Sequence, residues 1–317
     1  MYHYGILGFA SITPRFIQGI KLSEKGKVSA LASRNQDLKL DAIEIYDDYQ
    51  KLLQDPKIDV IYVPTPNYLH FQHAKAAITA LKHVIVEKPF TMTYESGKRL
   101  FDLAQAANVF IMEAQKIVFL PSTNWLKEQL AENLIGKLES ITLRQSFAEG
   151  DQNHWMYDDS KGGGVVYGSG NYPLEFMMHL FDTTDFKDFK AVRYVNENLV
   201  DEVVDINFKI NEIEINAYIT RKETFQSAAI FRGSKGEIIV EDFWRAKKAE
   251  MNFFNKPSDR IYFDFENEFK FEVDHINQCL EEKLLTSPIM KPEITLACLK
   301  YIDQIKETEP LPFKSKQ

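Results

Sequence analysis

The residue of this sequence with the clearest chemical potential is a lysine at the end of a buried strand. The apolar run His83–Glu87 predicts a β-strand, and Lys88 and Pro89 follow it directly. Open α/β sheets bind ligands at the carboxyl ends of their strands, so Lys88 is expected to reach into such a crevice. Its ammonium can hydrogen-bond a substrate oxygen there and stabilise the alkoxide-like charge that develops during hydride transfer. The alternative is a structural ion pair between Lys88 and Glu87.

A glycine turn near the amino terminus is typical of a dinucleotide-binding site. Gly5-Ile-Leu-Gly8 ends a predicted strand, and the turn continues through Phe9, Ala10, Ser11 and Ile12. Gly8 allows the tight turn that brings backbone amides up to a pyrophosphate at the start of the next helix. Ala10 stands in the place of the usual second glycine. A plain turn is the alternative, and the position at the first strand of an alternating domain favours nucleotide binding.

The end of the second predicted strand bears on the choice of dinucleotide. NAD-specific sites usually carry an acidic residue there, which binds the ribose 2′-hydroxyl. This sequence has Ser33 and Arg34, whose hydroxyl and guanidinium can instead bind a 2′-phosphate. The pattern favours NADP(H), although the nearby Asp37 leaves NAD(H) open. A solvated position in the loop is the alternative for Arg34.

A polar segment follows the fourth predicted strand. Thr65, Pro66, Asn67 and His70 are expected to line the same crevice. Asn67 can equally cap the following helix. His70 and His73 have an i, i+3 spacing that can hold a metal ion, but no third ligand lies nearby in the sequence. Two surface or capping histidines are the preferred interpretation, and no metal site is predicted.

The elements that must position these residues change in kind halfway along the chain. In the first part, predicted strands alternate with helices, which implies a parallel sheet with right-handed crossovers. The strands are predicted at Tyr2–Gly8, Val28–Ser33, Ile43–Tyr46, Val60–Pro64, His83–Glu87 and Val109–Glu113, and the helices at Ile12–Ser23, Leu69–Leu81 and Tyr94–Ala107. The crossover from Arg34 to Ala42 is shorter than the roughly dozen residues of a helical crossover, so part of that helix is expected to be missing.

The second part of the chain has the two-residue period of antiparallel strands. Apolar and polar residues alternate along Val204–Ile210 and Ile213–Ile219, which predicts a sheet with one buried face. Its polar outer face, with Asn207, Asn216 and Thr220, is expected to be exposed or part of a dimer interface. Further strands are predicted at Leu138–Phe147, Ser227–Arg232 and Glu237–Asp242, and helices at Thr123–Leu134, Leu174–Phe181, Val273–Leu284 and Glu293–Ile305.

These patterns together predict an α/β protein of two domains. Residues 1–120 are expected to form a Rossmann domain, which is a doubly wound parallel sheet. Residues 121–317 are expected to form an α+β domain with an open, mostly antiparallel sheet, and its closing helix is expected to pack back on the first domain. The length of 317 residues agrees with two domains of about 100 to 200 residues each.

Composition and charge exclude several classes of protein. The 44% hydrophobic and 26% charged residues are ordinary for a globular protein. The net charge of −8 would repel a nucleic-acid backbone. No uninterrupted run of about 18 apolar residues predicts a membrane span, and the amino terminus has no charged region ahead of its apolar strand, as a signal peptide would. Cys279 and Cys298 lie in apolar helical patterns, which predicts core residues in a reducing cytoplasm.

The motifs, taken in order, resemble the Gfo/Idh/MocA family of NAD(P)-dependent oxidoreductases, most of all its dihydrodiol and aldose-reducing members. No single motif would suffice, but the ordered set covers nearly the whole chain. It consists of Gly5-Ile-Leu-Gly8, Thr65-Pro66-Asn67 with His70, Glu87-Lys88-Pro89, Glu113-Ala114 with Phe119 and Pro121, Gly162-Gly163-Gly164 with Gly170 and Tyr172, and Ser287-Pro288-Ile289-Met290.

The resemblance implies a nucleotide-binding domain and an α/β domain whose open sheet commonly mediates dimerisation, so a homodimer or higher homo-oligomer is expected. It also implies reversible hydride transfer between the nicotinamide and a sugar, polyol or related carbonyl compound. By position, Lys88 matches the family's catalytic lysine, and Tyr172 matches its general acid or base. In reduction, Tyr172 would donate a proton to the carbonyl oxygen that Lys88 holds. The alternative for Tyr172 is an aromatic residue packed under the glycine turn.

Further contacts are implied on both sides of the reaction. Glu87, Lys88 and Gln115 would join the residues that bind the cofactor. The substrate pocket would be built from Lys88, Tyr172 and residues near them, namely Trp155, Tyr157 and Asn171. Trp155 and Tyr157 can stack on the apolar face of a sugar, and packing under the loop is the alternative for both.

Departures from the family pattern leave two functions open. Gly168 stands where the family often carries an aspartate, Trp155 stands where many members have arginine, and Gln115-Lys116 replaces an aromatic-basic pair. One interpretation is an NADP(H)-dependent oxidoreductase that acts on a small sugar-like or polyol-like compound. The other is a nucleotide-binding sensor or regulator of the same fold without turnover. The missing aspartate favours the second, whereas the presence of Lys88 and Tyr172 favours the first.

Overall fold

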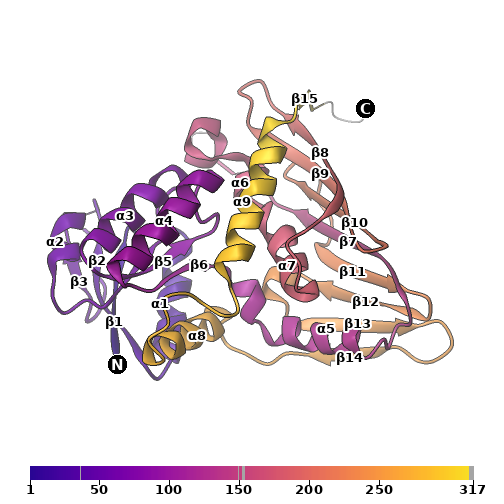
Figure 1. Cartoon of the computed structure of the whole chain (residues 1–317), viewed down its shortest axis with the longest axis horizontal. Coiled ribbons are helices and arrows are strands. Elements are labelled where there is room, and N and C mark those ends of the chain that lie inside the picture. The colour runs from indigo at the N-terminus through magenta and orange to yellow at the C-terminus, as the bar shows by residue number, and fades with distance from the viewer. Residues whose placement is uncertain (36, 149, 152–153, 314–317) are drawn as a thin grey trace. The chain divides into compact units, whose positions relative to one another are not determined.

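The computed structural model describes residues 1–35, 37–148, 150–151 and 154–313, and the chain divides into two compact units. The first unit combines residues 1–116 with residues 266–299, and the second combines residues 117–265 with residues 300–317. Each unit is therefore assembled from segments that are far apart in the sequence, as the colours of Figure 1 show.

The first unit is organised around a six-stranded parallel sheet in the order β3-β2-β1-β4-β5-β6, which confirms the predicted Rossmann sheet. The chain adds β2 and β3 on one side of β1 and then crosses to β4 on the other side. The loops after β1 and β4 therefore flank the point at which the winding reverses, where sheets of this kind bind nucleotides. The strands are β1 (Tyr2–Leu7), β2 (Gly26–Ala32), β3 (Glu44–Tyr46), β4 (Val60–Val63), β5 (His83–Glu87) and β6 (Ile111–Ala114).

Helices cover both faces of this sheet. Alternate strand residues such as Val63 and Val86 pack with α2, α3 and α4 in one apolar core. On the other face, the ring of Phe16 in α1 stacks on Tyr62 with centroids 3.6 Å apart, and it meets Phe269 of α8 edge-on at 5.8 Å. The helices are α1 (Thr13–Leu22), α2 (Tyr49–Gln54), α3 (His70–Thr79), α4 (Tyr94–Ala107) and α8 (Phe269–Glu281).

Part of the crossover helix between β2 and β3 was expected to be missing, and the described residues of this connection contain no helix at all. The helix α2 was missed because six residues carry too little periodicity to show an apolar face. α8 begins at Phe269, earlier than predicted, because the side-chain oxygen of Asn267 accepts a hydrogen bond from the Phe269 amide at 2.9 Å. Cys279 and Cys298 are buried, as predicted.

The second unit contains a nine-stranded sheet in the order β14-β13-β12-β11-β7-β10-β9-β8-β15. Most neighbours are antiparallel, as predicted, but β7 runs parallel to β10 and β15 runs parallel to β8. The strands β8, β13, β14 and β15 were not predicted, although the residues of β13 alternate between polar and apolar and could have revealed it. The strands are β7 (Leu138–Ser146), β8 (Lys187–Val195), β9 (Asp201–Ile210), β10 (Ile213–Thr220), β11 (Ala228–Gly233), β12 (Gly236–Glu241), β13 (Lys248–Phe253), β14 (Asp259–Tyr262) and β15 (Leu311–Pro312).

One face of this sheet is buried and the other is polar. Asn207 and Asn216 lie opposite each other on β9 and β10, and the Asn216 amide donates to Asn207 at 2.9 Å on the polar face. Thr220, which was predicted on the same outer face, is wholly buried. That prediction was wrong because the strand ends there and the chain turns back, so that the Thr220 hydroxyl accepts a hydrogen bond from the Lys222 amide at 2.9 Å.

The helices of the second unit include α7, which carries Tyr172, the candidate acid-base residue. The α7 helix begins at Asn171, three residues before the predicted start, and a further helix, α6, precedes it. The long helix α9 contributes its first residues to the first unit and its last turns to the second. The helices are α5 (Pro121–Ala131), α6 (Gly164–Ser169), α7 (Asn171–Phe181) and α9 (Pro292–Glu307).

Candidate active site

The turn after β1 has the conformation that a pyrophosphate site needs. Gly8 has φ +98°, a left-handed conformation that side chains disfavour, and its amide donates to the Ala32 carbonyl at 2.8 Å. A Cβ on Gly8 would meet only ordinary contacts at 3.4 Å, so the backbone conformation rather than space requires glycine. The Ala10 amide donates to the Thr13 hydroxyl at 3.0 Å, which shapes the start of α1. Phe9, Ser11 and Ile12 complete this turn, with Phe9 and Ser11 exposed. The turn and the helix start behind it fit a dinucleotide phosphate.

The residues after β2 lie at the next strand end. Ser33 is buried, its amide donates to the Tyr46 carbonyl at 2.9 Å, and its hydroxyl accepts a hydrogen bond from the Asn35 amide at 3.0 Å. Arg34 is exposed. A rigid serine followed by an exposed guanidinium is an arrangement that can accept a phosphate group.

His70 links the loops that follow β4 and β5. Its two ring nitrogens lie 2.6 Å from the Thr65 carbonyl and 2.8 Å from the Pro89 carbonyl, and the side chain is 1% exposed. The interpretation of His70 as a surface or capping residue is therefore wrong. Burial lowers its pKa to about 4, so the neutral ring donates to one of the two carbonyls at a time.

Asn67 and His73 complete the segment after β4. Asn67 is buried in a short 3₁₀ turn, η1 (Asn67–Leu69), in which Pro66 occupies the capping position. The alternative in which Asn67 caps the helix is therefore wrong, because Asn67 lies inside η1 and Leu69 occupies the N-cap position of α3. A ring nitrogen of His73 lies 3.1 Å from the Thr65 hydroxyl. Among the described residues, no group of three His, Cys, Asp or Glu side chains is placed to hold a metal ion.

The turn that carries Lys88 is fixed by buried carboxylates. Glu87 accepts a hydrogen bond from the Tyr62 hydroxyl at 2.5 Å and from the Lys88 amide at 3.2 Å. Glu113 accepts one from the Phe90 amide at 3.0 Å. The Lys88–Pro89 peptide bond is cis, and Lys88 itself is half-buried. Glu87 thus holds the backbone of Lys88. Gln115, one residue beyond β6, is wholly buried.

Beneath this turn lies a cluster of buried charges that the sequence pattern did not reveal. It consists of Glu87, Lys116, Glu268 and Glu272, and Arg15 closes it with an ion pair to Glu268 at 2.5 Å. Desolvation lowers the pKa of Lys116, whereas desolvation and the charge of Glu87 raise the pKa of Glu272 well above its ordinary value. Neither oxygen of Glu272 has a hydrogen-bond partner among the described residues. Glu272 therefore favours its protonated form.

In the second unit, Tyr172 lies on the polar side of a buried helix. Gly170 between α6 and α7 has helical dihedral angles, so residues three and four apart share one side across the junction. This polar side carries Gly168, Asn171, Tyr172 and Glu175. The other sides of α7 are apolar and equally buried. We call these four residues the polar side of α6 and α7.

Glu175 is a residue of this side that the sequence did not suggest. It is 1% exposed, and it accepts a hydrogen bond from the Asn171 amide group at 3.4 Å. The side-chain oxygen of Asn171 has no partner among the described residues. Burial of an acceptor without a partner is costly. The Asn171 oxygen, next to Glu175, is therefore suited to accept a hydrogen bond from a donor such as a substrate hydroxyl. The helical spacing from Tyr172 to Glu175 was the signal that could have found it.

The glycines at positions 164, 168 and 170 differ in whether a residue with a side chain would fit in their place. A Cβ on Gly164, whose φ is +91°, would approach Asp201 to 3.0 Å, and one on Gly170 would approach the Val166 carbonyl to 2.6 Å. A Cβ on Gly168 would have no described atom within 4 Å. Neither packing nor backbone conformation thus requires glycine at the position where the family often carries aspartate.

The segment 154–163 contains the other candidate pocket residues. Trp155 and Tyr157 lie in a 3₁₀ turn, η3 (Trp155–Tyr157), and both are half-buried. The Tyr157 hydroxyl accepts a hydrogen bond from the Gly150 amide at 2.5 Å, and the guanidinium of Arg221 lies 4.5 Å from the centre of its ring. One face of the Tyr157 ring is therefore covered by Arg221.

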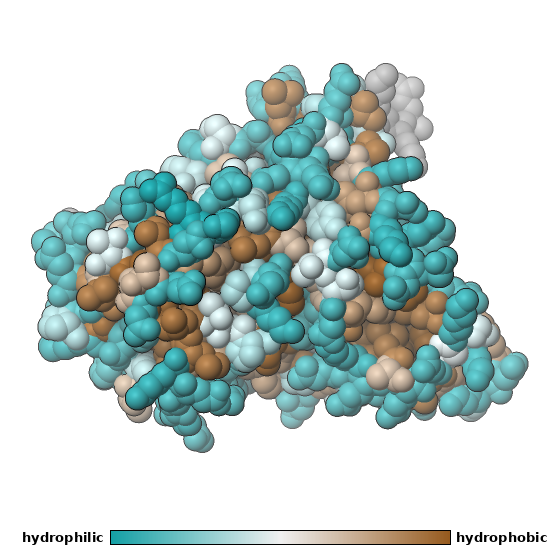
Figure 2. All heavy atoms as spheres, in the orientation of Figure 1, coloured by the Kyte–Doolittle hydropathy of each residue, from teal (hydrophilic) through white to brown (hydrophobic). Residues whose placement is uncertain are grey.

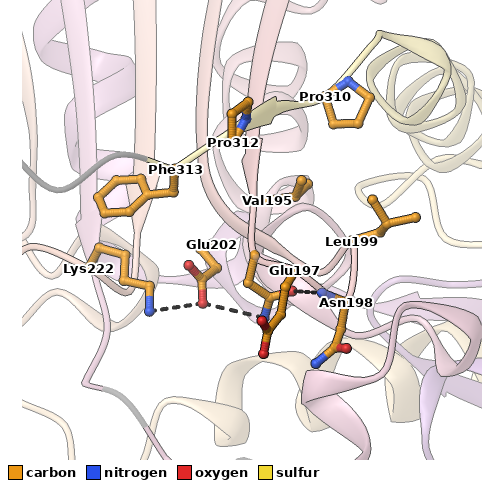
Figure 3. A pocket seen from close by; sticks show the side chains of 10 residues that line it. Val195, Glu197, Asn198, Leu199, Glu202, Lys222, Pro310, Pro312 and Phe313 are labelled. Carbon is orange, nitrogen blue, oxygen red and sulfur yellow. Dashed lines mark hydrogen bonds and ion pairs between the residues drawn. The ribbon is translucent and has the colours of Figure 1, made fainter.

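A separate open pocket lies at one edge of the nine-stranded sheet (Figure 3). Glu202 lies inside it and pairs with Lys222 at 2.9 Å, and Phe313 lies above this ion pair. None of the candidate site residues lines it. Elsewhere, hydrophilic side chains cover most of the face seen in Figure 2, with small hydrophobic groups between them. Within the described ranges, no helix has both the length and the apolar character to cross a membrane.

The sheet order, the glycine turn and the second, mixed sheet define a two-unit protein with a Rossmann dinucleotide-binding domain. Residues 2–115 match the model of the oxidoreductase family with an NAD-binding Rossmann fold, and residues 123–239 match the GFO/IDH/MocA C-terminal domain. The chain belongs to the Gfo/Idh/MocA family of NAD(P)-dependent oxidoreductases, as its motifs predict.

Individual relatives agree with this assignment. The chain is 24% identical to the scyllo-inositol 2-dehydrogenase (NADP(+)) IolU of Bacillus subtilis over the full length of both proteins. It is 33% identical to an uncharacterized oxidoreductase of Rhizobium meliloti, in a match that covers 55% of this chain and 54% of that protein. The 3-ketoreductase KijD10 of Actinomadura kijaniata, solved with NADP and TDP-benzene, has the same fold, with a TM-score of 0.90, 22% identity and 99% of each chain covered. Dihydrodiol dehydrogenases are also among the similar proteins.

Proposed function

We propose that this chain is an NADP(H)-dependent oxidoreductase that transfers a hydride between the nicotinamide and a small carbonyl or hydroxyl compound such as a sugar or polyol. The observations that carry the proposal are two prepared groups, one in each unit. One is the half-buried Lys88, on a turn fixed by Glu87, and the other is Tyr172, on the buried polar side of α6 and α7. A bound nicotinamide would supply or accept the hydride.

The residues of the chain would carry the other roles in the reaction, namely binding of the substrate and proton transfer. The ammonium of Lys88 would hold the reacting oxygen and stabilise its developing negative charge. The phenol of Tyr172 would donate a proton to that oxygen in reduction and accept it in oxidation. Asn171 and Glu175 would bind a neighbouring hydroxyl, while Trp155 and Tyr157 would border the pocket. The turn at Gly8 and the residues Thr65, Pro66, Asn67, His70 and Gln115 would border the cofactor.

Ser33 and Arg34 support NADP(H) as the preferred cofactor. IolU is named for NADP(+), and KijD10 was solved with NADP. Fluorescence titration with NADPH and NADH, followed by turnover measurements on sugars, inositols, diketones and other carbonyl compounds, tests the proposal. Tighter binding of NADPH and turnover of at least one hydroxylated carbonyl compound are expected. Turnover of none of these compounds would contradict it.

Arg34→Ala is expected to weaken NADPH binding about 10- to 100-fold, the usual effect of losing a charged hydrogen bond, and to leave NADH binding unchanged. The reason is that only NADPH carries the 2′-phosphate that Arg34 would pair with. Fluorescence titration of both cofactors measures the effect. Arg99→Ala, which removes an exposed guanidinium from α4, is the matched control. Equal weakening for both cofactors would place Arg34 outside the 2′-phosphate site.

Glu175→Gln is expected to lower kcat/KM for a hydroxylated substrate about 10- to 100-fold, because the substrate loses a charge-assisted hydrogen bond. The Tm and the Kd for NADPH are expected to stay unchanged, since glutamine can still bind the Asn171 amide. Steady-state kinetics and a thermal melt measure the two effects. Glu128→Gln, an exposed glutamate on α5, is the control. A lower Tm with unchanged kcat/KM would instead make Glu175 a structural residue.

A second candidate function is a nucleotide-binding sensor or regulator without turnover. Gly168 favours it, because a carboxylate found in many family members is absent there. Turnover of the carbonyl compounds distinguishes the two functions, because a silent sensor would bind NADPH but turn over none of these compounds. A homodimer or higher homo-oligomer and a cytoplasmic location remain predictions, and light scattering tests the first.

A further inference from the structure

A network of four charged side chains in the second unit joins a buried strand to the segment 154–163. Asp201 on β9 is wholly buried, and its two oxygens bind different cations, Arg193 at 2.7 Å and Lys306 at 2.7 Å. The ammonium of Lys306 also binds Asp159 at 2.6 Å. Two cations and two carboxylates thus balance each other, and Lys306 is the link between the strand and the segment.

Arg193 fixes the place of Lys306. Its guanidinium donates to the Lys306 carbonyl at 2.9 Å and to the Thr308 carbonyl at 2.8 Å, at the end of α9. Helix ends leave carbonyls without partners, and a cation there is favourable. Figure 1 shows the end of α9 beside the edge of the sheet that contains β8. Arg193 therefore fixes the backbone at Lys306, while Asp201 binds the ammonium group of the same residue.

The two ion pairs of Lys306 differ in burial. Asp201 is fully buried, whereas the side chain of Asp159 is 38% exposed and that of Lys306 is 15% exposed. Breaking a buried pair leaves an uncompensated charge and is strongly destabilising. An exposed pair contributes little to the stability of the whole protein. The contact with Asp159 can therefore be lost without loss of the fold.

Asp159 belongs to a segment with its own local structure. The Asp158 carboxylate accepts from the Ser160 amide at 3.1 Å and pairs with Lys161 at 2.7 Å. A Cβ on Gly163 would come within 2.6 Å of the Met156 carbonyl, so the segment closes tightly on the glycine turn. The segment is therefore locally compact, and the ion pair between Asp159 and Lys306 joins it to the end of α9.

We propose that Lys306 is a positioning residue that holds the segment 154–163, with Trp155 and Tyr157, in its binding arrangement through Asp159. The segment carries the candidate pocket residues, and Asp159 lies two residues after Tyr157. Arg221 over the Tyr157 ring forms the second anchor. That the arrangement serves a substrate rests on the proposed function, whereas the anchoring itself does not.

Hydrogen exchange tests the anchoring without any turnover. In Asp159→Ala, amides of residues 154–163 are expected to exchange about two- to fivefold faster, as the loss of one partly exposed ion pair implies. Asp185→Ala, an exposed carboxylate in the same unit, is the matched control and should exchange as the wild type does. Unchanged exchange in Asp159→Ala would overturn the proposal.

Lys306→Met is expected to speed exchange in the same segment and also to lower the Tm by several degrees, because it leaves Asp201 with one cation fewer. If Lys306→Met does not fold, Asp159→Ala still tests the anchoring of the segment. High salt gives a further measurement, since at about 1 M the screening length falls to about 3 Å. Salt should speed exchange of the segment in the wild type and leave Asp159→Ala unaffected, and an equal response of both would overturn the role of the ion pair.

Kinetics test the link to the substrate. If the wild type turns over a carbonyl compound, Asp159→Ala should raise its KM about two- to fivefold, with kcat and NADPH binding unchanged. Faster exchange with an unchanged KM would overturn the positioning role. If the wild type turns over no compound, the proposed function fails, and exchange alone then supports or overturns the anchoring by Lys306.

Discussion

Lys88→Met is expected to lower kcat about 10²- to 10³-fold, the usual effect of removing one donor that stabilises a developing oxyanion. Methionine keeps the length and apolar stem of the side chain but cannot donate a hydrogen bond. The turn is held by Glu87 through the Lys88 amide and by Glu113 through the Phe90 amide, so the backbone should stay in place. NADPH binding and the Tm are therefore expected to be preserved.

Steady-state kinetics with a substrate from the carbonyl panel, together with fluorescence titration of NADPH, separate these effects. Lys98→Met, which breaks only an exposed ion pair with Asp102 on α4, is the control. Tyr172→Phe should lower kcat about 10²- to 10⁴-fold, as expected for loss of a general acid. Wild-type kcat in Lys88→Met would contradict the proposed role of the ammonium.

Glu272→Gln is expected to stabilise the protein at pH 7, because glutamine fills the same buried position without a group that must either keep a proton or bury a charge. Glu272 is wholly buried, and desolvation is the first cause that raises its pKa, followed by the charge of Glu87. In the unfolded chain the same carboxyl ionises freely. Folding must therefore keep a proton on Glu272 or bury its charge.

The sign of the pH dependence follows from this raised pKa. The contribution of Glu272 to stability is fully present below the unfolded pKa of about 4.5 and is lost as pH rises toward the folded pKa. Glutamine does not titrate, so the advantage of Glu272→Gln should be small near pH 4 and should grow with pH. In the variant, the charges of Glu87 and Glu268 still lie next to Lys116.

Urea denaturation at several pH values measures the free energy of unfolding of both proteins. Glu281→Gln, on the exposed side of the same helix, is the control and should change stability little. A destabilised Glu272→Gln at pH 7 would mean that an ionised Glu272 is needed to balance Lys116.

The sequence predicted the parts of the molecule that repeat or alternate. The parallel sheet followed from the alternation of strands and helices, and the buried face of β9 and β10 followed from their two-residue period. The conformation of the turn at Gly8 followed from a glycine at a strand end. These features depend on local pattern, so the residues themselves carry the signal.

Features that depend on contacts between distant residues were not predicted. His70 was interpreted as a surface residue because its carbonyl partners, Thr65 and Pro89, belong to two different loops. Lys116 and Glu272 meet in the core although 156 positions separate them, so no local pattern shows that they are buried together. Glu175 was hidden because a single glutamate on an otherwise apolar helix looks like a solvent-facing position.

The divided construction of the first unit has a consequence for biosynthesis. During translation, α1 and the strands beneath it emerge long before α8, which begins only at Phe269. Until then, the aromatic surface around Phe16 and Tyr62 lacks the helix that covers it in the finished protein. Exposed apolar surface of this kind makes folding intermediates prone to aggregate. The first unit therefore lacks the cover that α8 gives to this aromatic surface while most of the chain is being synthesised.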